Sequence, residues 1–323
     1  MKTIREILTN DVGRVAIAGH VNPDGDCAGS CMALALYIRK NCPGVIVDVY
    51  LEPLRPELRF LKGTDSLIHE MTGEETCDLF ILLDVSSRAR IGVAGELFDK
   101  TARTVCIDHH IGNDSPAGIN HIRPTVGSCA EVLAELLDPD GIDAAIAEAL
   151  YTGIIHDTGV FQYSNTRPET LMLASRLIGY GFDFPHLIYD SFYARTHRQT
   201  RILGYCLEKS RLSADGRFLS VSLSLEEMAR YGAVRDDIGE VVSQLKLTRD
   251  IEMAVFVYET TPGFSKVSLR SSGRLDANKT AHLFGGGGHV MAAGCTLPGS
   301  SENVLSRILM ALEREGDSLK AEV

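Results

Sequence analysis

The stretch Thr104-Val105-Cys106-Ile107-Asp108-His109-His110 joins an apolar run, typical of a buried strand, to three ionisable side chains. The simplest interpretation is a turn with two surface histidines, since short motifs recur by chance. However, Val15 to Gly19 runs into His20 to Asp26 in the same way, and Leu79 to Leu83 runs into Asp84. Three such runs predict buried parallel strands with acidic and imidazole groups at their carboxyl ends. Ligands bind at that edge of an open α/β sheet, so we expect the functional site there.

The first half of the chain alternates predicted strands and helices, a pattern typical of a parallel sheet with crossover helices. We expect strands at 14–19, 45–50, 79–83 and 104–107, and helices at 28–39, 56–61, 93–100, 130–137 and 143–155. The last helix ends in His156-Asp157. His156 suits the negative end of a helix dipole, whereas a carboxylate is disfavoured there unless a cation lies beside it. Asp157 is therefore a further candidate ligand.

The second half predicts a smaller α/β unit. We expect strands at 217–225, 251–258 and 265–270, and helices at 236–246, 276–284 and 302–313. A polar, basic segment before them is expected to form a helix that connects two domains. The predicted organisation is a domain at 1–188, a linker helix at 189–212 and a domain at 213–323.

Four consecutive glycines, Gly285 to Gly288, lie inside the second unit and precede His289. A flexible connection is the plain interpretation. Glycines also let backbone N–H groups converge on an anion, and the basic stretch Arg270 to Arg274 is close in sequence. A pocket for a phosphate or carboxylate is the interpretation we favour.

Size and composition limit the function. With 323 residues, the chain is long enough for two cores. The net charge of −11 argues against binding to long duplex nucleic acid, so an anionic substrate must be small or held by a local basic patch. No apolar run is long enough to cross a bilayer and no secretory signal begins the chain, which predicts a cytoplasmic protein without a membrane partner. The eight cysteines form no C-x-x-C pair, and Cys27 and Cys31 are expected to pack rather than bind metal.

Eight side chains are candidate metal ligands: His20, Asp24, Asp26, Asp84, Asp108, His109, His110 and Asp157. One mononuclear site cannot use them all, whereas two adjacent divalent ions with a bridging carboxylate can. Mixed imidazole and carboxylate ligation suits Mn²⁺, Co²⁺ or Fe²⁺, while an all-oxygen site would favour Mg²⁺ or Ca²⁺. Two such ions activate water for in-line attack at phosphorus, so the residues predict hydrolysis of a phosphate ester or anhydride.

These residues also carry a family resemblance. His20 to Asp26 with Gly29-Ser30, then Asp84, then Asp108-His109-His110, then Asp157, resemble the four motifs of the DHH phosphoesterases. Arg270 to Gly273 with the glycine run and His289 resemble the DHHA1 domain that follows those motifs. The resemblance spans nearly the whole chain and implies an α/β fold: a parallel-sheet DHH domain, a helical linker and a smaller α/β DHHA1 domain, with the active site in the cleft.

The resemblance also implies residue roles. One metal, most naturally Mn²⁺, would be bound by His20, Asp24 and Asp84, and a second by Asp26, Asp84, His109 and Asp157, with Asp84 bridging. His110 would face the reacting phosphate and Asp108 would support the histidines, which makes His110, Asp108 and Asp84 the catalytic candidates. The remote part of the substrate would be held across the cleft by Arg270, Ser271, Gly286, Gly287, Gly288 and His289.

Within the family, a two-domain chain without further modules is similar to the NrnA type. That similarity implies degradation of RNA of a few nucleotides from its end, removal of the 3′-phosphate of adenosine 3′,5′-bisphosphate (pAp) and, by fold analogy, a homodimer. The same site is compatible with a cyclic dinucleotide, its linear product pApA or pGpG, polyphosphate or pyrophosphate. A non-catalytic nucleotide-binding protein is the alternative from another class, which the complete ligand set disfavours.

Overall fold

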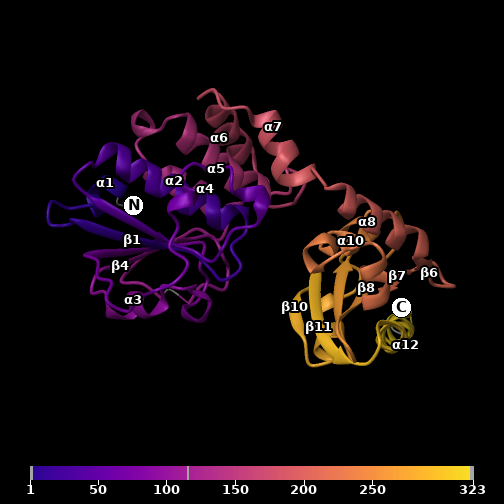
Figure 1. The fold of residues 1–323 in the computed structure, drawn as a ribbon. Coiled ribbons are helices and arrows are strands. Elements are labelled where there is room, and N and C mark those ends of the chain that lie inside the picture. Colours follow the sequence, from indigo (N-terminus) through magenta and orange to yellow (C-terminus); the bar gives the residue numbers. More distant parts are fainter. Residues whose placement is uncertain (1–2, 115, 321–323) are drawn as a thin grey trace. The chain divides into compact units, whose positions relative to one another are not determined.

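The computed structural model describes residues 3–114 and 116–320, and the chain divides into two compact units, Met1–Ala194 and Arg195–Val323 (Figure 1). In the described residues, no helix is both long and apolar enough to cross a membrane.

The first unit is built on a five-stranded parallel sheet with strand order β2-β1-β3-β4-β5. Its strands are β1 Arg14–Ala18, β2 Ile46–Tyr50, β3 Leu79–Leu83, β4 Thr104–Asp108 and β5 Ile119–Ile122. The four strands predicted from apolar runs are confirmed as β1, β2, β3 and β4. The sequence did not predict β5, which is a short edge strand with one hydrogen-bonded neighbour and polar residues at its centre.

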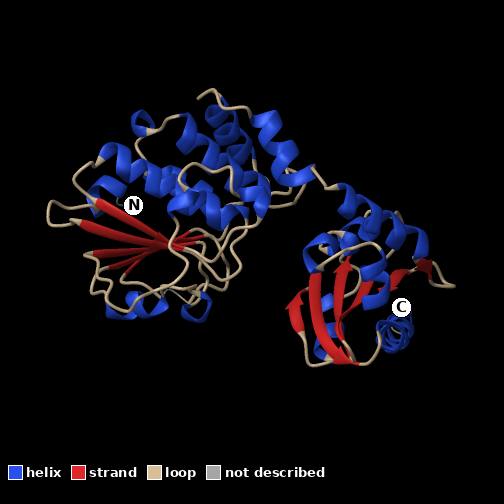
Figure 2. Ribbon diagram, in the orientation of Figure 1, coloured by secondary structure: helices blue, strands red, loops and turns tan. Residues whose placement is uncertain are grey.

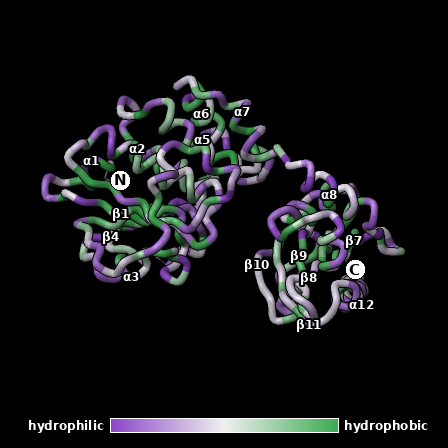
Figure 3. The backbone as a smooth tube through the Cα atoms, in the orientation of Figure 1, coloured by the Kyte–Doolittle hydropathy of each residue, from purple (hydrophilic) through white to green (hydrophobic). Residues whose placement is uncertain are grey.

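Helices cover both faces of this sheet (Figure 2). They are α1 Ile4–Ile7, α2 Gly25–Asn41, α3 Gly95–Lys100, α4 Cys129–Leu136, α5 Ala144–Asp157, α6 Pro168–Ile178 and α7 Phe184–Ile188. The larger core lies between α2, α4, α5 and one face of the sheet, and a smaller core lies between α3 and the other face. Both faces of the strands are therefore buried, and Figure 3 shows the hydrophobic stretches that follow from this.

One predicted helix of this unit is wrong. The segment 56–61 forms only a single 3₁₀ turn, Pro56–Leu58. Its N-cap residue, Arg55, makes no side-chain capping bond, and the chain turns into the left-handed region at Gly63 (φ 88°). The turn at Gly63 leaves too few residues after Pro56 for an α-helix to propagate.

The second unit contains a six-stranded mixed sheet with strand order β10-β11-β9-β8-β7-β6. Its strands are β6 Arg211–Leu212, β7 Phe218–Leu223, β8 Met253–Thr261, β9 Phe264–Ser271, β10 Gly287–His289 and β11 Ala292–Pro298. Its helices are α8 His197–Lys209, α9 Leu225–Arg230, α10 Val241–Lys246, α11 Ala277–His282 and α12 Ser301–Lys320. One core packs α8 and α10 on the sheet, and the other packs α11 and α12 on the opposite face.

Where the sequence predicts one linker helix over 189–212, the structure has two helical segments. A π-helical turn, Tyr189–Tyr193, ends the first unit, and α8 begins the second. The break has a local cause, because Thr196 and Gln199 form a capping box that starts a new helix. The predicted helix 236–246 is likewise divided into a 3₁₀ segment, Arg235–Ile238, and α10.

The glycine run is not a free loop. Gly287 and Gly288 belong to β10, which pairs with β11 in an antiparallel hairpin. A Cβ atom on Gly286 would lie 2.3 Å from the carbonyl oxygen of Gly294, and one on Gly288 would lie 2.5 Å from that of Ala292. Gly288 also has φ of 152°, which L side chains rarely adopt. These glycines are therefore needed for close backbone packing at the sheet edge.

Candidate metal centre

The predicted ligands of the first unit come from the carboxyl ends of β1, β3 and β4, the start of α2 and the end of α5. Parallel strands bring their carboxyl ends to one edge, and the close packing of α2 on α5 brings the two helix ends to the same edge. Gly29 and Gly153 permit this packing, because a Cβ atom on Gly29 would lie 2.5 Å from the carbonyl oxygen of Ala149. A Cβ atom on Gly153 would lie 2.5 Å from the Asp26 carboxylate.

His20 follows β1 and is 5% exposed. Its Nδ1 lies 2.8 Å from the carbonyl oxygen of Val21, which can only accept, so Nδ1 carries a proton in that bond. The other nitrogen, Nε2, faces two carboxylates, at 3.6 Å from Asp24 Oδ2 and 3.4 Å from Asp84 Oδ2. A backbone bond that fixes the ring and leaves Nε2 directed at carboxylates is the arrangement typical of a metal-binding histidine.

Asp24 and Asp26 are fixed by helix starts. Asp24 is the N-cap of α2, where its Oδ1 accepts bonds from the N–H groups of Asp26 and Cys27, both at 3.1 Å. Asp26 is fully buried, and its carboxylate accepts from the N–H groups of Cys129 and Ala130 in the first turn of α4. Backbone donors and the positive end of α4 thus help to keep a carboxylate in the interior.

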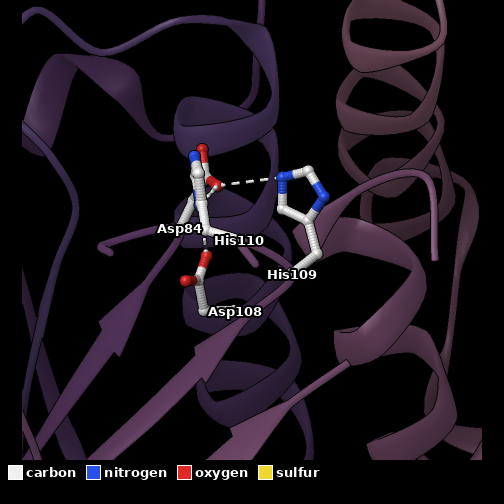
Figure 4. Close-up of side chains that lie close together, drawn as sticks. All are labelled: Asp84, Asp108, His109 and His110. Atoms are coloured by element: carbon white, nitrogen blue, oxygen red, sulfur yellow. Dashed lines mark hydrogen bonds and ion pairs between the residues drawn. The ribbon is translucent and has the colours of Figure 1, made fainter. Parts of the chain in front are cut away.

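Asp84 lies at the centre of the cluster. It is 3% exposed and has φ of 59°, an uncommon conformation for a residue other than glycine. Its Oδ1 lies 3.5 Å from His109 Nε2 and has no hydrogen-bond partner among the described residues (Figure 4). A buried carboxylate oxygen without a hydrogen-bond donor is costly unless a cation satisfies it.

The two histidines after β4 have different partners. His109 Nε2 lies 3.0 Å from Asp157 Oδ2 and 3.9 Å from Asp26 Oδ2. His110 Nδ1 lies 2.8 Å from Oδ1 of the fully buried Asp108, a contact that Figure 4 marks with a dashed line. Asn113 donates its side-chain amide to the other oxygen of Asp108. Asp108 therefore holds the His110 ring, while His109 points into the carboxylate cluster.

Charge in the cluster is unbalanced. Burial lowers the pKa of His20, but hydrogen bonds with Asp24 and Asp84 outweigh it and raise that pKa to about 12. Burial likewise opposes charge on His109, and the carboxylates of Asp157 and Asp84 beside it raise its pKa to about 12. Burial, with the nearby charges of Asp84 and Asp157, raises the pKa of Asp26 well above its usual range. Without cations, protons must therefore offset part of the carboxylate charge.

The donor set fits divalent metal ions. In the described residues, three groups of side chains have ligand atoms within 4.8 Å of one another: Asp84 with Asp108, His109 and His110; His20 with Cys27 and Asp84; and Asp26 with His109 and Asp157. Two donors bound to one ion at about 2.1 Å lie roughly 3.0 to 3.4 Å apart at octahedral or tetrahedral angles. The four shortest contacts of His20 and His109 with carboxylates, at 3.0 to 3.6 Å, are close to that spacing.

The structure brings together all eight candidates of the first half, and it adds residues that the sequence did not predict as functional. Asn113 holds Asp108, Gly29 and Gly153 allow the helix contact, and Cys27 joins a ligand group. His156 does not act as a charge at the helix end: burial lowers its pKa to about 4, and its ring packs on Gly25 and Phe192. Apart from Gly29, which lies in the first motif, no sequence signal identifies these roles, because they follow from contacts that only the folded chain makes.

In the second unit, the strand register places Arg270, Ala292 and His289 side by side on β9, β11 and β10. Residues in register share a face, so Arg270 and His289 lie on one face of the sheet, two strands and roughly 10 Å apart. Ser271 alternates to the other face, is 1% exposed and donates its hydroxyl to the carbonyl of Leu275. Its hydroxyl thus stabilises the loop after β9.

Known proteins are similar to this chain over nearly its whole length. The model of the DHH family, N-terminal domain, matches residues 14–154, and that of the DHHA1 domain matches residues 218–315. A "Bifunctional oligoribonuclease and PAP phosphatase NrnA" of Thermus thermophilus is 32% identical over 98% of this chain and 94% of its own length. A protein of the same name from Bacillus subtilis is 29% identical over 97% of this chain and 98% of its own. The crystal structure of an "exopolyphosphatase-related protein" from Bacteroides fragilis, 25% identical, superposes with a TM-score of 0.88 and covers 96% of this chain and 94% of its own.

Proposed function

The chain belongs to the DHH family of phosphoesterases with a DHHA1 domain, and from this premise we propose that it hydrolyses short oligoribonucleotides and the 3′-phosphate of pAp with two divalent metal ions. The observation that supports this most is the carboxylate and imidazole cluster around Asp84, whose buried Oδ1 has no hydrogen-bond partner in the described part of the chain. Two proteins named for both activities align with this chain over nearly its full length.

We assign the metal ligands as two sets that share Asp84. His20, Asp24 and Asp84 would hold one ion, and Asp26, Asp84, His109 and Asp157 would hold the other. Mixed nitrogen and oxygen donors favour Mn²⁺ among the common ions. When bound, such a pair of ions would supply hydroxide at neutral pH and offset charge on the phosphate.

His110 is the residue that we place against the reacting phosphate. Its Nδ1 bond to Asp108 leaves Nε2 free, and its side chain is 36% exposed, which a substrate contact requires. The Asp108 hydrogen bond raises the pKa of His110, so the ring is more readily protonated. A protonated Nε2 would donate to a phosphoryl oxygen or to the leaving group.

We assign substrate binding in the second unit to Arg270 and His289 together with the glycine edge of β10. Arg270 and His289 lie on one face of a sheet, where a guanidinium and an imidazole suit an anionic group. Local contacts of this kind, rather than a broad basic surface, agree with the net charge of −11 and with a short substrate. We place the enzyme in the cytoplasm.

The test is a metal titration. Protein stripped of metal should release no phosphate from pAp, and activity should return as Mn²⁺ is restored, with binding complete at two equivalents per chain by equilibrium dialysis. Full activity in the stripped protein, or saturation at one equivalent, would contradict the dinuclear assignment.

A further inference from the structure

Cys27 lies in the first turn of α2, between the proposed ligand Asp26 and the apolar part of the helix. It is fully buried. Its Sγ, a ring nitrogen of His20 and a carboxylate oxygen of Asp84 lie within 4.8 Å of one another. A sulfur atom is therefore beside the same two side chains that we assign to one metal ion.

Gly19 creates the space for this sulfur. A Cβ atom at position 19 would lie 2.1 Å from Cys27 Sγ, so any other residue would displace the thiol from beside His20. Cys31, one turn further along α2, is also fully buried, and its Sγ would lie 3.4 Å from that Cβ atom. Cys31 is not in the ligand group that contains Cys27, which makes it a matched control.

We propose that Cys27 is an additional donor to the metal ion held by His20, Asp24 and Asp84, and that it makes this half of the centre select thiophilic divalent ions such as Co²⁺, Zn²⁺ and Cd²⁺ over Mg²⁺. The proposal rests on the metal centre of the proposed function. When the sulfur–metal bond forms, the S–H bond breaks and its proton leaves to solvent. The other half has only nitrogen and oxygen donors, so the two halves differ in metal preference.

The test uses Co²⁺, because thiolate ligation gives a sulfur-to-cobalt charge-transfer band in the near ultraviolet. Wild-type protein stripped of metal and titrated with Co²⁺ should develop this band. Cys27→Ser and Cys27→Ala should lack it, while Cys31→Ala should retain it. The dissociation constant for Cd²⁺ should rise at least about tenfold in Cys27→Ala, with a change of less than about threefold for Mg²⁺.

The possible failures are distinct. Wild-type protein that binds two equivalents of Co²⁺ without the band would overturn the role of Cys27 and leave the metal centre intact. A band that persists in Cys27→Ser, or is lost equally in Cys31→Ala, would also overturn it. Wild-type protein that binds no Co²⁺ at all would instead contradict the proposed function.

Discussion

At the scale of single residues, Asp84 connects the two proposed metal sites. It lies 3.4 Å from His20 through one oxygen and 3.5 Å from His109 through the other. Its pKa lies below the usual range, because the imidazoles of His109 and His20 beside it outweigh the effect of burial. The residue also has a positive φ, a conformation that asparagine tolerates at least as well as aspartate.

Asp84→Asn should therefore keep the backbone and remove the shared negative charge. We expect bound Mn²⁺ to fall from two ions to one or fewer per chain, and hydrolysis of pAp to fall at least about a hundredfold. Asp99→Asn is the control, since Asp99 is exposed and pairs only with Arg88 among the interactions described. Unchanged metal content in Asp84→Asn would refute its bridging role.

The sequence predicted the chemistry-bearing residues but not their supports. Strand ends are recognisable because buried parallel strands are continuous apolar runs, so the acids and histidines that follow them could be assigned to one edge. Gly153 and Asn113 carry no such signal. Gly153 matters because it has no side chain at a helix contact. Asn113 matters because its side chain reaches Asp108 across a turn.

At the scale of secondary-structure elements, Glu227 joins two helices of the second unit. It closes the capping box of α9 through the N–H of Ser224 at 2.8 Å and accepts from Lys209 of α8 at 2.5 Å. Burial would raise its pKa, but the bonds with Lys209 and Tyr205 outweigh burial and lower it below its ordinary value of 4.5.

Glu227→Gln keeps the cap and removes the charge. We expect a loss of about 1 to 2 kcal/mol in the stability of the second unit at pH 7. Because the pKa in the folded protein is lowered, this difference should be complete above pH 4.5 and should vanish as pH falls through the folded pKa. Urea unfolding of this unit, followed by pulsed hydrogen exchange, measures the loss of stability.

Glu226→Gln, on the exposed side of the same turn, is the control and should change stability by less than about 0.5 kcal/mol. Equal effects of the two variants would contradict the role assigned to Glu227.

The hairpin of β10 and β11 gives a second prediction at this scale. Gly288→Ala should destabilise the hairpin by about 1 to 3 kcal/mol, because the new Cβ atom would lie 2.5 Å from the Ala292 carbonyl and φ is unfavourable. Faster amide exchange in β10 and β11 should report it, and KM for pAp should rise with metal content unchanged. Gly287→Ala meets nothing closer than 3.4 Å and should leave hairpin exchange nearly unchanged. Similar amide exchange in both variants would contradict the claim that the close approach of Gly288 to the Ala292 carbonyl determines the stability of the hairpin.

Several elements that the sequence missed are edge strands, and β11 was missed as well, because it begins in the small-residue run Ala292-Ala293-Gly294. The edge strands β5 and β10 have polar or glycine residues and one partner each, so no alternation identifies them. The predicted linker helix forms two helical segments instead of one. Its polar composition gives no sign of a break, but the Thr196 cap starts a new helix. Long, apolar elements were predicted with nearly correct limits.

At the scale of the whole molecule, both matched domains occur in the expected order, within a parallel-sheet unit and a mixed-sheet unit. The net charge of −11 argued against a broad basic surface, and the motifs identified the family. Neither selects among phosphate substrates, because that choice depends on the contacts made by the second unit with the bound molecule.

The most direct test is a comparison of substrates with protein stripped of metal and reloaded with Mn²⁺. It should release phosphate from pAp and mononucleotide from pApA, with little product from a 24-nucleotide RNA or from polyphosphate in the same time. Degradation of the 24-nucleotide RNA as fast as pApA, or phosphate release from polyphosphate but not from pAp, would contradict a short-substrate enzyme.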